Sequence, residues 1–480
     1  MTTLLLAASL AGCAVGPDYA TPAMELPQAY KEAGPWKLAT PGQIDPDQPW
    51  WQAYGDTQLN ALIERANGAN QSIAQAEAQY RQASAAAQLA RASLWPTVGA
   101  SLGTSRAQTN TNGVHRLSDS YSAGLNASWE ADIWGRIRRS AEAGDASAEA
   151  SAASLAAARL SIQATLAQNY LQLRVTDLQR DLYRRTVEAY TRSLQLSSHQ
   201  YAAGTALRSD VAQAETQLRS AQAQLIDLDA TRNQLEHAIA ILTGQAPALF
   251  SLAPLPPAPG QSEQQAMDAN AARLQASLPQ IPSGLPSQLL ERRPDIAVAE
   301  RQAAAANANI GVARAAYFPT LTLSASGGYG SVAFGQLFDT PSRVWSLGAA
   351  LAETLFDGGA RTARNAQATA AFDAAVAQYK QTVLGGMQEV EDNLSTLRVL
   401  DQESAVQAQA VQAAQLAQRL AMSQYQAGTV TYLSVVTTQA TALTNQRTAV
   451  TLLGRQLLAS VALIKATGGG WHAPASTASR

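Results

Sequence analysis

The chain has 480 residues, with 34 basic and 36 acidic side chains and a formal net charge of -2. Its charged share of 15% is well below the roughly 25% of an average soluble domain, whereas its hydrophobic share of 46% is ordinary. The near-neutral charge excludes a protein that binds nucleic acid by neutralising phosphates, because such a protein needs a basic surface. The abundance of apolar residues also excludes a wholly disordered chain.

The N-terminus is similar to a bacterial lipoprotein signal. An apolar run over residues 4–11 is too short to span a bilayer and leads into the sequence LAGC, which ends at Cys13. This resembles a lipobox, so we predict that residues 1–12 form a signal peptide and that Cys13 becomes acylated. No Lys or Arg precedes the apolar run, and we therefore expect the true translation start to lie upstream. The alternative is a buried free cysteine; a disulfide within the chain is excluded because Cys13 is the only cysteine.

After this segment the chain falls into two similar halves. Proline clusters at 17–49 and 247–294 and is absent from 97–246 and 342–473. Three sequence matches recur in the same order at a spacing of about 223 residues, which predicts that the two halves fold alike. The matches are Arg91–Thr97 with Arg314–Thr320, Gln200–Thr205 with Gln424–Thr429, and Thr243-Gly244 with Thr467-Gly468.

In the first half the hydrophobic period changes from helical to extended and back. Residues 58–94 predict a helix that ends at Pro96, and strands follow near 97–107 and 119–133, where apolar and polar residues alternate. The stretch from Gly135 to about Tyr201 predicts a helix of roughly 100 Å. A turn at Gly204-Thr205 precedes a helix whose leucines have coiled-coil spacing. The second half repeats this order, with strands near 320–331 and 343–356.

Four alternating strands of about ten residues are typical of an outer-membrane barrel. Four strands cannot close a barrel, and an open edge in lipid would leave backbone groups without partners. Two chains would give eight strands and a filled interior, whereas three give twelve strands and an open lumen, so a trimer is favoured. The alternative is a soluble antiparallel sheet with one wet face. An interfacial aromatic girdle is predicted from the aromatic residues on the apolar phase, which are Tyr121, Trp129, Tyr329 and Trp345.

Several motifs carry a resemblance to a known family. They are Cys13–Tyr19, Trp50-Trp51 with Tyr54-Gly55-Asp56 and Leu59–Ile63, Ser128-Trp129-Glu130 with Trp134-Gly135-Arg136, Leu289-Leu290 with Arg292–Glu300, Ala304–Gly311 and Gly468–Trp471. In this order, and with the duplication, they resemble the outer-membrane factors of tripartite resistance-nodulation-division efflux pumps, in the TolC-like, NodT-type lipoprotein branch. The resemblance spans essentially the whole mature chain.

The resemblance implies a mainly α fold with a membrane β-barrel, in which a homotrimer forms a twelve-stranded barrel that continues into a periplasmic helical tunnel. The implied partners are outer-membrane lipid, a periplasmic adaptor protein and an inner-membrane proton-driven transporter. Each chain would be a subunit of a passive, gated efflux duct in the outer membrane. The lipid on Cys13 would be its single covalent group, with no cofactor, no bound metal and no nucleic-acid partner.

The predicted organisation follows from these boundaries. Residues 13–57 form a lipid-anchored equatorial segment, 58–244 the first repeat, 245–288 a Pro-rich equatorial linker, 289–468 the second repeat and 469–480 a tail. By resemblance, the Pro-rich segments and the tail form a belt around the tunnel.

The turns between the long helices are the predicted working end of the tunnel. By resemblance, the tips that dock the adaptor are Gly204, Thr205, Gly428 and Thr429, although glycine also caps helices there. The predicted periplasmic gate consists of Tyr201, Asp210, Tyr425 and Tyr432. The second repeat has Ser434 and Thr437 where family members often carry acidic residues, which reduces the acidic ring.

Two other classes of protein remain as alternatives. A periplasmic coiled-coil adaptor lipoprotein would share the anchor and the helices but would not need four alternating strands. An enzyme is disfavoured because the four histidines lack metal-ligand spacing and no nucleophile elbow or phosphate loop is present. Arg292-Arg293-Pro294-Asp295 is interpreted as a helix start rather than a substrate site.

Overall fold

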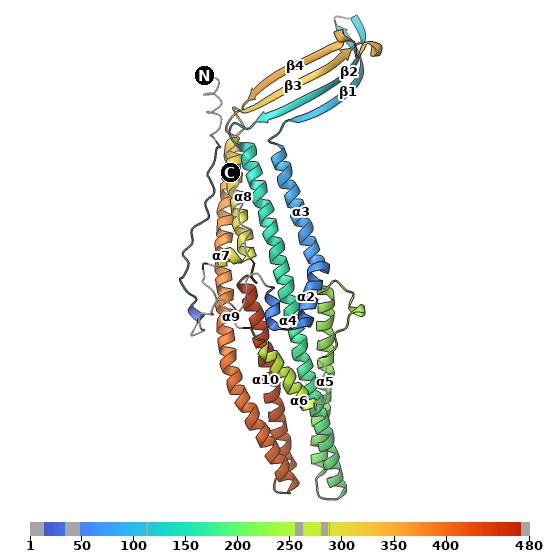
Figure 1. Cartoon of the computed structure of the whole chain (residues 1–480), viewed down its shortest axis with the longest axis vertical. Coiled ribbons are helices and arrows are strands. Elements are labelled where there is room, and N and C mark those ends of the chain that lie inside the picture. The colour runs from blue at the N-terminus through green and yellow to red at the C-terminus, as the bar shows by residue number, and fades with distance from the viewer. Residues whose placement is uncertain are drawn as a thin grey trace. The chain divides into compact units, whose positions relative to one another are not determined.

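We describe a computed structural model of the chain (Figure 1). The structure describes residues 14–33, 49–111, 114–254, 263–279, 287 and 289–471. The predicted lipidation site, Cys13, lies outside the described residues, as does the predicted signal peptide.

The duplication is visible in the lengths of the elements. Helices α3 (Gln71–Ala92) and α8 (Pro294–Ala315) have 22 residues each, α4 (Arg136–Ala202) and α9 (Ala360–Gln426) have 67 each, and α5 (Arg208–Leu242) and α10 (Tyr432–Ala466) have 35 each. Between them lie the strand pairs β1 (Thr97–Thr111) with β2 (Val114–Ala131), and β3 (Thr320–Ser331) with β4 (Arg343–Ala352). The predicted helix-strand-strand-helix repeat is thus confirmed.

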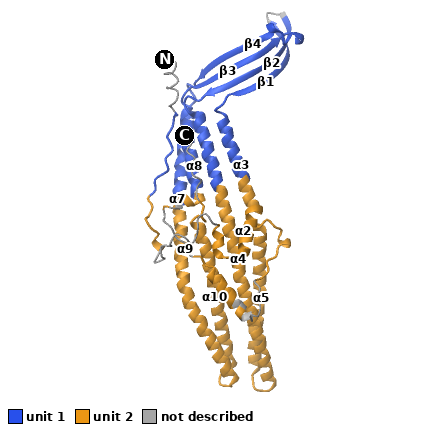
Figure 2. Cartoon of the chain, in the orientation of Figure 1, with its two compact units in different colours: residues 1–24, 78–153, 296–382 blue, residues 25–77, 154–295, 383–480 orange. Residues whose placement is uncertain are grey.

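Two compact units make up the chain (Figure 2). Unit 1 comprises residues 1–24, 78–153 and 296–382 and contains the sheet; unit 2 comprises residues 25–77, 154–295 and 383–480. The long helices α4 and α9 each contribute to both units. The two compact units therefore divide each repeat, whereas the predicted domains divide the chain between the repeats.

The sheet of unit 1 is fully antiparallel, with the order β1-β2-β3-β4. The first hairpin is longer than the expected 97–107 and 119–133, because β1 continues to Thr111 and β2 begins at Val114. Strand β4 ends at Ala352, before the expected 356. The connection between β3 and β4 contains two short 3-10 helices, η5 (Phe334–Gln336) and η6 (Thr340–Ser342).

The single helix predicted over 58–94 is wrong, because it is split at Asn70 into α2 (Thr57–Ala69) and α3. The Asn70 side-chain oxygen accepts hydrogen bonds from the backbone N–H groups of Ser72 and Ile73, at 2.9 and 3.1 Å, and so begins α3. Its amide nitrogen donates to the carbonyl oxygen of Leu242 at the end of α5, at 2.8 Å. One polar residue thus ends α2 through its backbone and, through its side chain, starts α3 and ties both helices to α5.

The main core lies in unit 2, where α4 crosses the aromatic 3-10 helix η2 (Trp50–Tyr54). Trp50 and Trp51 are buried, and their rings meet edge to face at 5.8 Å. They pack in one cluster with Leu166, Tyr170 and Leu173, which lie at three-to-four-residue spacing along α4. Helix α4 therefore packs on the N-terminal segment through large aromatic side chains, which bury more apolar area than any other residue type.

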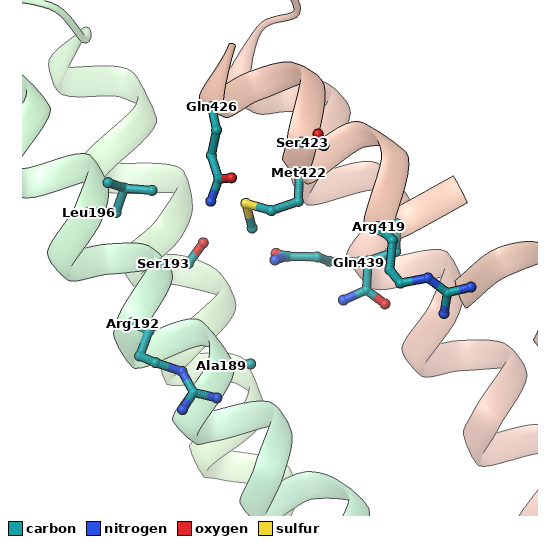
Figure 3. Close-up of a pocket in the computed structure, with 10 residues that line it drawn as sticks. Ala189, Arg192, Ser193, Leu196, Arg419, Met422, Ser423, Gln426 and Gln439 are labelled. Carbon is teal, nitrogen blue, oxygen red and sulfur yellow. The ribbon is translucent and has the colours of Figure 1, made fainter. Parts of the chain in front are cut away.

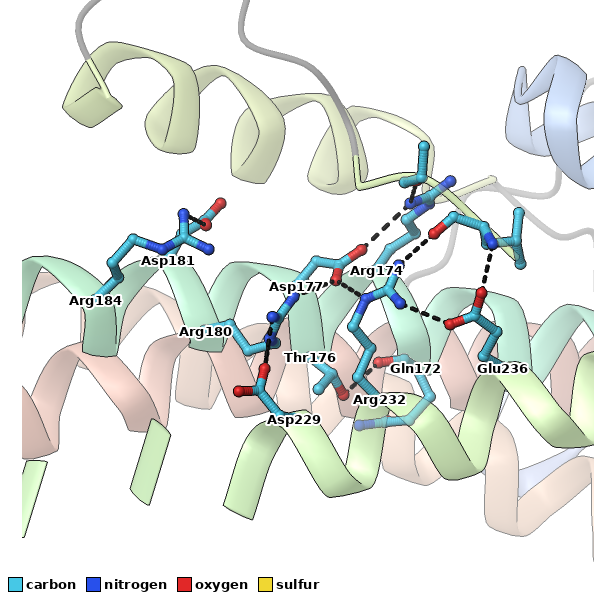
Figure 4. Close-up of polar contacts among 12 residues, drawn as sticks. Gln172, Arg174, Thr176, Asp177, Arg180, Asp181, Arg184, Asp229, Arg232 and Glu236 are labelled. Carbon is cyan, nitrogen blue, oxygen red and sulfur yellow. Dashed lines mark hydrogen bonds and ion pairs between the residues drawn. The ribbon is translucent and has the colours of Figure 1, made fainter. Parts of the chain in front are cut away.

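A buried network of charges joins α4, α5 and the chain that follows α5 (Figure 4). The Arg232 guanidinium donates to Asp177 at 2.8 Å, to Glu236 at 2.7 Å and to the Leu252 carbonyl oxygen. Glu236 accepts from the Leu252 N–H at 2.5 Å, and Arg174, which is 1% exposed, donates to the carbonyl oxygen of Ala253 at 3.0 Å. Because each charge has an opposite partner, the network holds the linker on the helices without a lone buried ion.

The remaining described elements are short. They are η1 (Lys31–Ala33), η3 (Pro247–Leu249), α6 (Glu263–Ala276) and α7 (Leu289–Arg292). Among the described helices, α10 alone is long and apolar enough to cross a membrane. In this chain 61% of the most apolar 18-residue stretch of α10 is buried. Leu457, Val461 and Ile464 belong to the core cluster of unit 2, so α10 is a core helix.

Candidate channel surfaces

The strand register gathers the apolar residues of all four strands on one face of the sheet. At one level of the sheet Val98 pairs with Ala127, Ala127 with Ala325, and Ala325 with Leu347. Directly paired residues point to the same face of the sheet. The apolar residues of each strand therefore lie beside the apolar residues of its neighbours. The large side chains of this face are exposed in the single chain: Val98 70%, Leu102 80%, Leu125 60%, Trp345 77%, Leu347 75% and Leu351 68%.

This apolar band has defined limits along the strands. At one end Ala131 pairs with Leu321, and at the other end Tyr121 pairs with Thr104. Beyond Tyr121 the same face carries the ion pair of Arg106 with Asp119. The ten steps from Tyr121 to Ala131, at about 3.4 Å each, give about 34 Å along the strand, or about 26 Å in height at the tilt of barrel strands. The band thus matches the roughly 25 Å apolar belt of outer-membrane barrels.

All four aromatic residues predicted for the girdle lie on this face. Tyr121 and Tyr329 stand near its far end, where their rings meet Phe334 and Phe338 of the β3–β4 connection at 5.6 and 5.4 Å. The other two differ in position. Trp129 lies near the opposite end and donates its ring N–H to the carbonyl oxygen of Leu94 at 3.0 Å, whereas Trp345 pairs with Gly327 in the middle of the band.

The two edge strands of the sheet, β1 and β4, each have one side without a neighbouring strand in the described chain. In lipid, the unpaired N–H and C=O groups of such an edge have no water to bind. The apolar face is suited to lipid, whereas the unpaired edges are not. Both can be satisfied only when further strands pair with the edges and complete the sheet.

The two turns between the long helices of unit 2 have the same hydrogen-bond pattern. In the first turn the Gly204 N–H donates to the Tyr201 carbonyl and the Thr205 N–H donates to the Gln200 carbonyl, both at 2.9 Å. In the second turn Gly428 and Thr429 repeat these bonds at 2.9 and 3.0 Å, to Tyr425 and Gln424. This is the Schellman pattern, and it requires the positive φ angles of Gly204 (75°) and Gly428 (74°).

The threonines of both turns, Thr205 and Thr429, are exposed to solvent, and each makes one further hydrogen bond within its turn. The hydroxyls of Thr205 and Thr429 each donate to the carbonyl oxygen five residues earlier, at 3.0 Å, and both bonds are exposed. A Cβ built on Gly204 or Gly428 would meet nothing within 4 Å. The turns are therefore held by their own hydrogen bonds, and their glycines and threonines are open to solvent.

The predicted gate tyrosines are brought together in part. The rings of Tyr425 and Tyr432 lie 5.3 Å apart, and the Tyr425 hydroxyl donates to the side-chain oxygen of Gln200 at 2.5 Å. Tyr432 is only 2% exposed and donates to the Ser193 hydroxyl at 3.3 Å, so it packs inside the chain. Burial raises the pKa of Tyr425 above its usual 10, and the negative charge of Asp210 adds to this.

The other two predicted gate residues have different surroundings. Asp210 accepts a hydrogen bond from the backbone N–H of Leu207 at 3.3 Å and so caps α5, whereas Tyr201 is 46% exposed beside the turn. Sequence reasoning did not select Gln200 and Ser193, the partners of the tyrosines. Gln200 could have been found, because it opens the duplicated motif that ends in Gly204-Thr205.

A pocket of about 430 Å³ lies in the same part of unit 2, between α4, α9 and α10 (Figure 3). Its lining combines Arg192 and Ser193 of α4 with Arg419 and Met422 of α9 and Gln439 of α10. Ser193 is also the acceptor for Tyr432, so the pocket adjoins the tyrosine pair. The two arginines give it a cationic rim.

In unit 1 the segment that follows Cys13 is tied to helices α4 and α8. The Val15 N–H donates to the Trp134 carbonyl at 3.0 Å, and Arg139, which is 6% exposed, pairs with Asp18 at 2.7 Å. Gly16, with φ of 115°, lies against Gly311, where an added Cβ would come within 2.6 Å of the Gly311 Cα. We call residues 14–19 the N-terminal strap; its close approach needs both glycines.

No group of three or more His, Cys, Asp or Glu side chains is placed to hold a metal within the described residues.

Comparison with known proteins agrees with these surfaces. The family model for outer membrane efflux proteins matches residues 62–245 and 285–469, most of the chain. The chain therefore belongs to the outer membrane efflux protein family.

Individual relatives cover nearly the whole chain. The pyoverdine export outer membrane protein OpmQ of Pseudomonas aeruginosa is 35% identical over 448 residues, which is 91% of each chain. The cation efflux system protein CusC of Escherichia coli O6:H1 is 27% identical over 472 residues, covering 97% of this chain and 98% of the relative. Among solved structures, the outer-membrane channel OprN has a TM-score of 0.86 and 30% identity, over 96% of this chain and all of that chain.

These findings confirm the predicted fold class, a mainly α chain of TolC-like channel type that adds four strands to a trimeric barrel. They also confirm the predicted function and location: the protein is an outer-membrane channel component of an efflux system. The alternative of an adaptor without its own pore is wrong, because the four strands form the sheet of a channel fold. The family is one of transport channels rather than enzymes.

Proposed function

We propose that this chain is the lipid-anchored, gated duct of a tripartite pump, coupled to a periplasmic adaptor and to a proton-driven transporter in the inner membrane. The observation that carries the proposal is the continuous apolar face of the sheet, with two edge strands that need further chains. Energy would come from the transporter, because a wide, passive lumen has no means of driving transport. The duct would export small molecules.

In the membrane, three chains supply twelve strands, enough for a barrel with an open lumen. The apolar face would meet lipid, and Tyr121, Trp129 and Tyr329 would contribute to the aromatic girdle, whereas Trp345, predicted for the girdle, would face lipid in the middle of the band. The opposite face, with residues such as Asn126 and Ser326, would line the lumen. Cys13 would carry the acyl chains, with no further cofactor.

At the other working surface, the paired turns would dock the adaptor. What supports this is their identical bonding, their open surroundings and the exposed hydroxyls of Thr205 and Thr429. A two-fold repeated tip on each of three chains would present six similar sites to adaptor hairpins. The cationic rim of Arg192 and Arg419 adds a surface suited to acidic side chains.

The gate would form where Tyr425 meets Gln200 and where Tyr201 and Asp210 stand beside the first turn. Tyr432 would act indirectly, because its burial against Ser193 sets the position of the Tyr425 ring. Ser434 takes the place of an acidic residue in the second repeat, so tyrosine-amide hydrogen bonds would carry more of the closed state than ion pairs.

The docking proposal predicts the effect of a double substitution, Thr205→Arg with Thr429→Arg. Two bulky cations at the tips would obstruct the adaptor without touching the core, so export in an efflux assay should fall strongly while trimer yield is unchanged. The matched control is Thr216→Arg with Thr441→Arg, two exposed threonines on helices α5 and α10, which follow the two turns. Normal export by the tip variant, or equal loss in the control, would count against docking there.

A further inference from the structure

Two aromatic rings connect the end of strand β2 with the start of the neighbouring strand β3. Trp134, in the turn after β2, stacks on Phe318, which precedes β3, with ring centroids 4.7 Å apart and an angle of 24°. The Trp134 ring N–H also donates to the carbonyl oxygen of Pro319 at 2.8 Å. Strands β2 and β3 are antiparallel neighbours, so this contact closes their shared end.

The residues that precede Phe318 and Trp95 are bonded on the side of the strand that follows each turn. Tyr317 donates its hydroxyl to Thr362 at the start of α9, at 3.3 Å, and α9 follows β4, the next strand after β3. In the first repeat the matching residue is Leu94, whose carbonyl accepts from Trp129 of β2, the next strand after β1. In both repeats this turn is therefore bonded to the side of the following strand, through the Tyr317 hydroxyl in one and through the Leu94 carbonyl in the other.

By the same duplication, Trp95 corresponds to Phe318 and should face the strand that precedes β1. No described strand of the same chain occupies that place, and Trp95 is 74% exposed. In the second repeat, the turn after β4 corresponds to the turn after β2 that carries Trp134. This turn carries Leu355 and Phe356, each 89% exposed. Two large apolar groups thus stand open at corresponding ends of the two edge strands.

We propose that Phe356, with Leu355, packs on Trp95 of a neighbouring copy of this chain and so closes the barrel between subunits. The inference rests on the proposed multi-chain channel and adds the residues that join its subunits. When β4 pairs antiparallel with β1 of the next copy, the end of β4 lies beside the start of β1, as the end of β2 lies beside the start of β3. The Trp134–Phe318 stack within the chain is the template for the contact between chains.

The test is a double variant, Trp95→Cys with Phe356→Cys, treated with a short bis-maleimide in the native membrane. Covalent dimers and trimers should form, with the trimer as the largest product, because a closed ring of three copies ends there. Each single variant should stay monomeric on a denaturing gel. Trp134→Cys with Phe318→Cys is the positive control for reach, because it should cross-link within one chain and give no larger band.

Three results would overturn parts of this account in different ways. A trimer of native size that gives no cross-linked species, while the internal control reacts, would overturn the proposed contact. A ladder that ends at the dimer would support the contact and overturn the three-chain barrel. A protein that is monomeric by light scattering in detergent would overturn the proposed channel assembly itself.

Alanine variants provide a second measurement that does not depend on cysteine chemistry. Trp95→Ala should reduce the fraction of trimer that survives detergent heating by at least about tenfold, because each of the three interfaces loses one aromatic contact. Trp95→Phe should retain the trimer, because the second repeat uses phenylalanine at the corresponding site. Leu89→Ala, at a residue 73% exposed on α3, is the matched control, and a loss equal to that of Trp95→Ala would contradict the proposal.

Discussion

At the scale of single residues, the chain places its buried charges where segments without regular structure must be held. Arg232 bonds to Asp177 of α4, to Glu236 of its own helix and to the backbone of Leu252. A linker has few backbone partners of its own, so a guanidinium with five donors is a suitable clamp. The same chemistry recurs in unit 1, where Arg139 holds Asp18 of the N-terminal strap.

The clamp predicts a large loss of stability for Arg232→Met. Methionine keeps much of the apolar stem, but it leaves Glu236 and the Leu252 carbonyl oxygen buried without their cation and removes one of the three arginines that pair with Asp177, which costs about 3–5 kcal/mol. Thermal melting followed by circular dichroism should report the loss. Arg219→Met is the matched control on the same helix, since Arg219 is 66% exposed in its ion pair and should cost about 0.5 kcal/mol or less. Equal melting of the two variants would contradict the role of the buried network.

At the scale of elements, the duplication of the sequence determines the order and the lengths of the helices. Two helices of 67 residues, two of 35 and two of 22 arise from a duplication that the sequence reveals through repeated motifs. The strands follow the period-two pattern, because side chains on alternate faces meet lipid or water. The apolar face is then a consequence of register, which pairs like phases across all four strands.

The parts that sequence reasoning missed depend on single polar or small residues. The break at Asn70 arises from a side-chain cap, and no proline or pattern change marks it. The contact of Gly16 with Gly311 joins positions almost 300 residues apart, which no local pattern can reveal. The burial of Tyr432 was likewise hidden, because an aromatic beside a turn suits a gate and a core equally well. Periodicity predicts elements, whereas long-range pairs of residues need the folded chain.

The register predicts opposite outcomes for two adjacent substitutions in β2. Leu125→Arg places a charge in the middle of the apolar band, at a cost of about 2–4 kcal/mol for a lipid-facing site near the midplane. Asn126→Arg places the same charge on the other face, where water in a lumen would solvate it. The fraction of folded trimer in isolated outer membranes should fall for Leu125→Arg and remain near normal for Asn126→Arg. The reverse order would place the lumen on the apolar face and refute the assignment.

At the scale of the whole molecule, two membrane attachments would begin in the same unit. The strap that follows Cys13 is bound to the turn after β2 through Val15 and Trp134, and this turn lies just past the Ala131 end of the apolar band. Acyl chains on a residue two positions before Val15 would therefore enter the membrane beside the barrel rather than apart from it. The anchor and the barrel would act on the same leaflet.

This arrangement predicts a limited effect for Cys13→Ala. The variant should lose metabolic labelling by palmitate, and its attachment should weaken during assembly, because lipid chains contribute about 0.8 kcal/mol per buried CH₂. The apolar band of the sheet is unchanged, however, so barrels that have formed should resist extraction of the outer membrane with carbonate as the parent protein does. Label retained on the variant would refute the lipidation of Cys13. A variant that is unlabelled but wholly released by carbonate would mean that the acyl chains, rather than the twelve strands, hold the protein in the membrane.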